Sequence, residues 1–154
     1  MMTRADLQPW IEEREREADG IAVLAPGYLA AMKSRIMDRD MTGLAMLSFS
    51  YAMAHGVQTN EILKACREIT FTKGEGYAGS GDFLANFYRV GRREGISPIS
   101  VAAVYMWKHI DWLDTYETTG VAHGSEGLAS RITDIILYAA LCRAIQIREE
   151  GKSS

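Results

Sequence analysis

Three charged residues recur at intervals of three in the helical stretch that follows Pro98. Lys108, Asp111 and Asp114 would lie along one face of that helix, because side chains three positions apart are neighbours on a helix surface. Carboxylates beside an ammonium group could hold Mg²⁺, which prefers oxygen ligands and often shares its coordination shell with substrate phosphates. A solvated helix face with a local ion pair has the same pattern. The sequence leaves both interpretations open.

Asp134 stands within the most apolar helical segment of the chain. An aspartate is almost never fully buried without a partner, so this carboxylate requires one. Arg131, three residues earlier, could form a structural ion pair with it. A metal ion or the ammonium group of Lys108 is the alternative, and it would place Asp134 in a functional site.

Four glycines lie between Lys73 and Asp82, and the sequence there contains a G-x-G-x-x-G pattern at Gly74, Gly76 and Gly79. A dinucleotide-binding fold needs a strand before such a pattern and a helix after it. A helical pattern precedes it here, which argues against that fold. We predict a loop that either makes a tight turn between helices or closes over a ligand.

The elements that must position these residues are helices. Apolar residues recur at helical spacing along the chain, and strict alternation never extends over more than a few residues. We therefore predict an all-α fold, an antiparallel bundle of about six to seven helices with short connections. The predicted helices span about 9–18, 27–39, 43–55, 60–72, 82–95, 98–117 and 125–151.

Composition and charge restrict the class of protein. The chain has 17 Lys and Arg residues against 20 Asp and Glu, a formal net charge of −3, which argues against a binder of nucleic-acid polymers. Cys66 and Cys142 lie in apolar helical patterns and are predicted to be buried free thiols, typical of a reducing cytoplasm. The longest nearly apolar stretch, residues 43–54, is too short for a membrane span. We expect a soluble cytoplasmic protein.

Several of these residues also carry a family resemblance between about residues 61 and 149. In chain order they are Lys73, Tyr77, Asp82, Asn86, Lys108, and Asp134 four residues before Tyr138. This order and spacing resembles the MazG-like all-α nucleoside triphosphate pyrophosphohydrolases, in particular their short phage-type branch. The resemblance implies a core of four helices within residues 61–150. Residues 1–60 would be a helical extension packed on that core, and residues 151–154 a disordered tail.

The resemblance also implies a metal site. Catalytic members of the family bind Mg²⁺ through Glu-x-x-Glu on one helix and Glu-x-x-Asp on the next. The corresponding residues are Asp111 and Asp114, followed by Arg131 and Asp134. The implied catalytic and metal-binding residues are therefore Asp111, Asp114 and Asp134. Mg²⁺ there would orient water for attack on a (deoxy)nucleoside triphosphate, releasing the monophosphate and pyrophosphate.

Six residues are the candidate substrate-binding set under the same resemblance. Lys73 and Lys108 would neutralise phosphate charge, Tyr77 would contact the base or sugar, and Asn86 would make directional polar contacts. The set is completed by Asp82 and Tyr138. The family usually completes its site across a subunit interface, which implies a homodimer or a larger homo-oligomer, in the host cytoplasm if the protein is phage-encoded.

Two other functions stay open. Arg131 stands where the family has a carboxylate, which favours a protein that binds or sequesters a nucleotide without cleaving it. A structural or protein-binding bundle is the third hypothesis. In it, methionines would form an adaptable surface. These are Met32, Met37, Met41, Met46 and Met53.

Overall fold

All regular secondary structure in the described part of the chain is helical, which confirms the predicted all-α class. The computed structural model describes residues 1–19, 27–77, 81–121 and 127–152, with the backbone alone described for residue 19 and residues 71–77. A short 3-10 helix, η1, precedes seven α-helices within these ranges. The elements are η1 (Arg4–Asp6), α1 (Leu7–Asp19), α2 (Tyr28–Met37), α3 (Met41–Ala54), α4 (Thr59–Tyr77), α5 (Ala85–Glu94), α6 (Pro98–Thr119) and α7 (Leu128–Lys152).

Local sequence signals set several of these helix ends. Pro98 occupies the first turn of α6, and the Ser97 hydroxyl accepts a hydrogen bond from the Ser100 backbone N–H at 3.2 Å. Proline costs no hydrogen bond there, and the serine satisfies one of the unpaired N–H groups. Asp40 caps α3 in the same way, accepting from the Gly43 N–H at 2.9 Å. The predicted start of α6 is confirmed.

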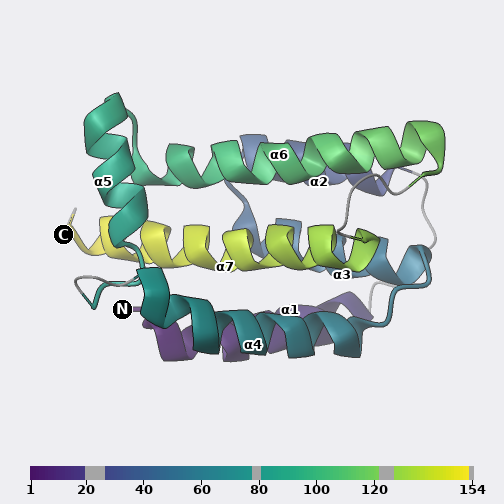
Figure 1. Ribbon diagram of the computed structural model, residues 1–154, viewed down its shortest axis with the longest axis horizontal. Coiled ribbons are helices and arrows are strands. Elements are labelled where there is room, and N and C mark those ends of the chain that lie inside the picture. The colour runs from purple at the N-terminus through teal and green to yellow at the C-terminus, as the bar shows by residue number, and fades with distance from the viewer. Residues whose placement is uncertain (20–26, 78–80, 122–126, 153–154) are drawn as a thin grey trace.

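Six of the helices form two layers of three (Figure 1). One layer contains α4, α7 and α6, and the other contains α1, α3 and α2. Contacts between the layers join α7 to α3, α4 to α1 and α6 to α2. The fifth helix, α5, runs across one end of the first layer and packs against α6. Helix α7 is thus flanked by α4 and α6, with α3 behind it.

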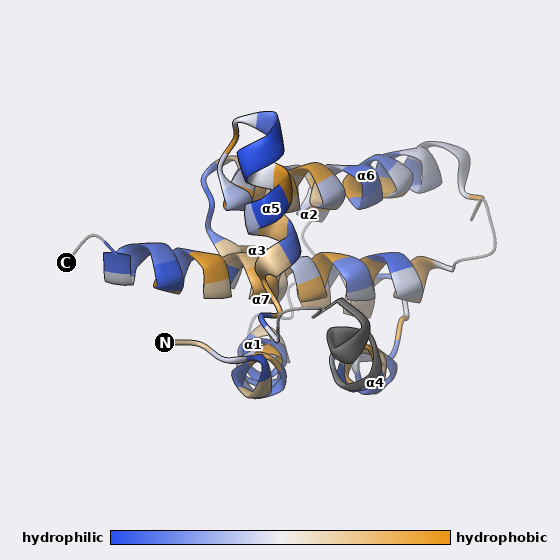
Figure 2. Ribbon diagram, turned by 60° about the vertical axis from the view of Figure 1, so that its left-hand side comes forward, coloured by the Kyte–Doolittle hydropathy of each residue, from blue (hydrophilic) through white to orange (hydrophobic). Residues whose placement is uncertain are grey.

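The core lies between the layers and is centred on α7. Ile132, Ile135 and Ile136 of α7 are fully buried, as are Leu44 and Phe49 of α3. Burying each such side chain contributes roughly 1.5–3 kcal/mol of hydrophobic free energy. Figure 2 shows hydrophilic residues along the outer side of α5 and at the C-terminal end of α7.

Residues before and after position 60 contribute to the same buried cluster. Ile11, Met32 and Leu44 from the N-terminal part belong to it, together with Ile110 and Ile136 from the C-terminal part. The division into units 1–60 and 61–150 stays a prediction, as does the MazG-like core. None of the helices in the described ranges combines the length and apolar character needed to cross a membrane.

Helices α4 and α7 continue into segments that the sequence predicts to be a loop and a tail. Helix α4 continues to Tyr77, so Gly74 and Gly76 lie within its backbone rather than in the predicted loop. Each glycine reduces the stability of a helix by only about 1 kcal/mol relative to alanine. This cost is too small to end α4 before Tyr77. Gly79 falls outside the described residues. Helix α7 runs through Lys152, two residues into the segment predicted as a tail, whose last residues, 153–154, are not described.

The methionines and cysteines lie largely inside the bundle. Met32 and Met41 are 0% and 1% exposed and belong to the core, whereas Met37 is 69% exposed. Cys66 and Cys142 are buried free thiols, as predicted. Burial raises the pKa of each thiol to about 12, so both remain protonated near neutral pH. A protonated thiol is a poor nucleophile and a poor metal ligand.

Candidate functional site

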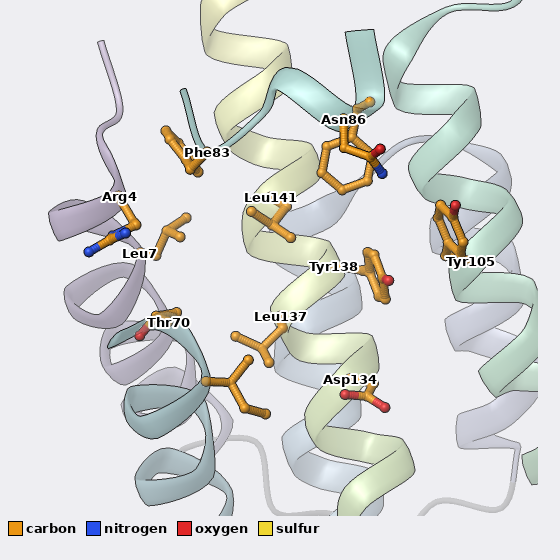
Figure 3. A pocket seen from close by; sticks show the side chains of 12 residues that line it. Arg4, Leu7, Thr70, Phe83, Asn86, Tyr105, Asp134, Leu137, Tyr138 and Leu141 are labelled. Carbon is orange, nitrogen blue, oxygen red and sulfur yellow. The ribbon is translucent and has the colours of Figure 1, made fainter. Parts of the chain in front are cut away.

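A cavity of about 260 Å³ lies along one face of α7 (Figure 3). Helix α7 contributes Asp134, Leu137, Tyr138 and Leu141, whose spacing of three and four residues places them on one side of the helix. The volume is close to the lower end of small-molecule sites, roughly 300 Å³. The described part of the cavity is therefore large enough for a small organic ligand.

The other walls come from distant parts of the chain, most of them apolar. Each flanking element supplies one to three lining residues. They are Arg4 and Leu7 from η1 and α1, Ile69 and Thr70 from α4, Phe83, Asn86 and Phe87 from α5 and the turn before it, and Tyr105 from α6. An apolar cavity with a few polar groups is typical of sites that bind and orient small molecules.

Aromatic rings form one wall of the cavity. The Tyr138 ring lies nearly parallel to the Tyr105 ring, with centroids 5.7 Å apart and an angle of 10° between the planes. Phe87 meets Tyr138 edge-on at 6.3 Å, and His109 stacks on it at 6.0 Å. Offset-stacked and edge-to-face pairs are the favoured geometries of aromatic rings. This wall offers a flat, rigid surface against which a planar ring can pack.

A buried histidine connects Arg131 to the carboxylate of Asp134. The Nη1 atom of Arg131 lies 3.2 Å from Nδ1 of His109, and Nε2 of His109 lies 3.7 Å from Oδ2 of Asp134. A guanidinium group only donates hydrogen bonds, so Nδ1 is the acceptor and the ring proton belongs on Nε2, facing Asp134. The Arg131 guanidinium also lies 5.4 Å from the Trp112 ring centroid. Arg131 thus reaches Asp134 through the histidine ring.

The structure brings three of the predicted site residues together. Asn86, Asp134 and Tyr138 line the same cavity, and Figure 3 shows Tyr138 between the other two along α7 and α5. Lys108 and Asp111 are exposed on α6 and are not among the residues lining the cavity. The side chains of Lys73 and Tyr77 lie outside the described part of the structure.

Asp114 has a different partner from the one predicted. Its Oδ1 atom accepts a hydrogen bond from Nζ of Lys33 at 2.7 Å, which joins α6 to α2. Both side chains are more than a third exposed, at 38% for Lys33 and 44% for Asp114. This carboxylate therefore points toward the second layer of helices, away from the cavity.

The predicted metal ligands do not converge within the described residues. No group of three His, Cys, Asp or Glu side chains in those ranges could hold a metal ion. The reason is geometric: Asp111 is exposed on α6, Asp114 pairs with Lys33, and Asp134 faces His109. Mg²⁺ bound to protein needs carboxylates converging on one point. The described acids do not fit that requirement within one chain.

Asp82 has a structural role at the turn before α5. Both of its carboxylate oxygens accept hydrogen bonds from Arg148 at 2.9 Å, and Oδ1 also accepts from the Leu84 N–H at 3.0 Å. The Arg148 guanidinium, helped by the Leu84 N–H, lowers the pKa of the carboxyl group below its ordinary value. Asp82, predicted as part of the substrate-binding set, therefore joins the turn to α7 and is not among the residues lining the cavity.

Sequence reasoning missed several residues of the site, above all Tyr105, His109 and Arg4. Tyr105 and His109 are four residues apart on α6, so a shared face was predictable. That this face meets Tyr138 depends on the register between α6 and α7. Arg4 comes from a short helix about 130 residues earlier than Asp134, and no local pattern signals its place in the cavity.

Comparisons with protein-family models, with curated proteins and with solved structures each gave no match for this chain. The fold and the cavity therefore stand on the sequence and the structure alone. The likeness to MazG-like pyrophosphohydrolases stays a prediction.

Proposed function

We propose that this protein binds a nucleotide in the cavity on α7, without relying on the three predicted aspartates to cleave it. The observation that carries the proposal is the joint placement of Asn86, Asp134 and Tyr138 around one cavity. Two of these three belong to the substrate-binding set that the family resemblance implies. The aromatic wall at Tyr105 and Tyr138 supplies the packing surface that a nucleobase needs.

The lining residues match the parts of a nucleotide. The rings of Tyr138 and Tyr105 would pack against the base, and the side-chain amide of Asn86 would donate to and accept from its polar edge. Arg4, on the opposite wall, has the guanidinium group that suits a phosphate. These contacts require neither a metal ion nor a reacting group.

Binding without hydrolysis agrees with the placement of the acids. Of the three predicted metal ligands, Asp134 alone lines the cavity, and Asp114 is held by Lys33 on another side of α6. Arg131 adds a positive charge close to Asp134 through His109. A cation at this point opposes Mg²⁺ binding by charge repulsion.

The second candidate is the Mg²⁺-dependent nucleoside triphosphate pyrophosphohydrolase that the resemblance implies. Asp134 favours it, because the last predicted metal ligand does line the cavity beside Asn86 and Tyr138. The homodimer expected of that family belongs to this candidate. A partner chain would have to complete the set of acids.

A nucleotide panel tests both candidates. Thermal unfolding is followed with each common ribo- and deoxynucleoside mono- and triphosphate, once in EDTA and once with Mg²⁺. A nucleotide at about 100 times its Kd stabilises the folded protein by about 2.7 kcal/mol, which raises the Tm of a chain this size by roughly 5–10 °C. Pyrophosphate release is assayed in the same Mg²⁺ samples.

We expect a Tm increase with at least one nucleotide in EDTA, absent in Tyr138→Leu and retained in Tyr116→Leu. Tyr116 lies on α6 but does not line the cavity in the described residues. Pyrophosphate release would establish the second candidate instead. No Tm increase with any nucleotide, with or without Mg²⁺, would contradict nucleotide binding altogether.

A further inference from the structure

The cavity has opposite charges on opposite walls. Its two formally charged lining residues within the described ranges are Arg4, on η1, and Asp134, on α7. Figure 3 shows them on different sides of the cavity, with Leu7, Thr70 and Leu137 between them. A ligand that carries an anionic group at one end and N–H donors at the other complements this arrangement.

We propose, building on the proposed nucleotide binding, that the cavity selects guanine nucleotides. The phosphate would lie toward Arg4 and the base toward Asp134, with its ring against the Tyr105–Tyr138 wall. The selection comes from the carboxylate, because an ionised aspartate offers acceptors only. A base that presents two adjacent N–H donors to it gains two hydrogen bonds.

Guanine is the common base with this edge. Its N1–H and its 2-amino group are adjacent donors that match the two oxygens of one carboxylate, a pairing that is strong because it is bidentate and charged. Adenine presents an acceptor nitrogen beside its single amino group, and so does cytosine. That acceptor would face a carboxylate oxygen, which costs binding free energy because neither group can donate.

His109 and Arg131 are positioning residues for this carboxylate. The Arg131 contact at 3.2 Å sets the proton of His109 on Nε2, and this N–H faces Oδ2 of Asp134. A carboxylate has about four lone-pair sites, so Asp134 can satisfy its protein partners and still accept from a ligand.

The test is a calorimetric measurement of Kd for GMP, IMP and AMP in EDTA. We expect GMP to bind about 5- to 150-fold more tightly than AMP, the discrimination typical of one bidentate base contact. IMP keeps N1–H but lacks the 2-amino group, and its Kd should fall between the other two. Equal Kd values for GMP and AMP would overturn the selectivity while leaving nucleotide binding intact. Absence of binding by all three would overturn the guanine selectivity, whereas nucleotide binding itself is overturned only if no nucleotide of the full panel raises the Tm.

The variant Asp134→Asn tests whether the preference for GMP comes from the carboxylate group of Asp134 or only from the size of its side chain. It keeps the side-chain size and replaces one acceptor oxygen by an NH₂ donor, so the preference for GMP over AMP should disappear. Xanthosine monophosphate, with a carbonyl in place of the 2-amino group, should then bind more tightly than it does to the wild type. Asp38→Asn, at the exposed end of α2, is the matched control and should keep the GMP preference. An Asp134→Asn protein that folds with an unchanged melting curve and still prefers GMP would overturn the assignment of Asp134.

Discussion

Nη1 of Arg131 lies 3.2 Å from Nδ1 of His109, and this contact ties the middle of α6 to the start of α7 beside the cavity. The histidine is buried, with 10% of its side chain exposed. The same ring stacks on Tyr138 at 6.0 Å. One buried imidazole therefore connects the charged and the aromatic parts of the candidate site.

Replacing this acceptor should destabilise the fold. His109→Phe keeps a ring of similar size but leaves the Arg131 guanidinium without the nitrogen it donates to. A lost hydrogen bond to a charged group costs about 1.5–3 kcal/mol, a Tm decrease of roughly 3–10 °C. His109→Gln, whose side-chain oxygen can accept, should recover part of the loss. Equal melting temperatures for His109→Phe and the wild type would show that the contact has no energetic role.

The Lys33–Asp114 pair should contribute little to stability. The two side chains are 38% and 44% exposed, and exposed ion pairs are worth about 0–1 kcal/mol because solvent screens them. A double-mutant cycle with Lys33→Met and Asp114→Asn, measured by urea unfolding, should give a coupling energy within that range. If Asp114 were a metal ligand instead, Mg²⁺ would raise the Tm of the wild type and have no effect on Asp114→Asn.

The Asp82–Arg148 bridge should make stability depend on pH in the acid range. Arg148 lowers the pKa of Asp82 in the folded protein, so the bridge stabilises fully above the unfolded value near 3.8 and is lost as the pH falls through the lowered value. Asp82→Asn keeps the acceptor for the Leu84 N–H but removes the charge. We expect it to melt about 1–4 °C below the wild type at pH 7.

The same comparison at low pH provides the control. The difference in Tm between the wild type and Asp82→Asn should shrink as the pH falls below 3.8 and through the lowered pKa of Asp82, because the wild-type carboxyl group then becomes protonated as well. Asp38→Asn, which removes an exposed charge at the end of α2, should show no comparable trend. A difference that stays constant from pH 7 through the whole acid range in which the protein remains folded would contradict an electrostatic origin.

Gly91 marks a close approach between α5 and the turn that follows it. A Cβ atom at this position would lie 2.7 Å from the backbone oxygen of Ile96. Gly91→Ala should therefore destabilise the protein by about 1–3 kcal/mol, although alanine favours helix formation. Gly151→Ala, near the end of α7 with nothing within 4 Å of the new Cβ, should be neutral or slightly stabilising. Chemical denaturation of the two variants distinguishes these effects.

Much of the fold was predictable because its signals are local. Ser97 and Pro98 begin α6 where the sequence indicates, and apolar residues such as Ile132 and Ile136 face the core at helical spacing. The end of α4 was not predictable, because the glycines at 74 and 76 compete with a helix already formed and the balance depends on packing.

The site was predictable only in part, for a physical reason. Asp134 needed a partner inside an apolar helix, and Asn86 and Tyr138 were candidates, but spacing along one helix cannot show which way it faces its neighbours. Asp111 and Asp114 share α6 with His109, yet it is His109 that faces Asp134. The rotation of α6 about its own axis decides which of its side chains face α7. A different rotation would be needed to bring the two aspartates of α6 to Asp134.

The most direct test of a guanine-nucleotide site on α7 is a methyl NMR titration with GMP in EDTA. Ile69, Leu137 and Leu141 line the cavity, whereas Ile36 and Leu44 are buried in the other layer of helices. We predict saturable shifts in the first three methyl groups and none in the last two, with the response lost in Tyr138→Leu. Shifts in no methyl group, or shifts confined to Ile36 and Leu44, would contradict a guanine-nucleotide site in this cavity.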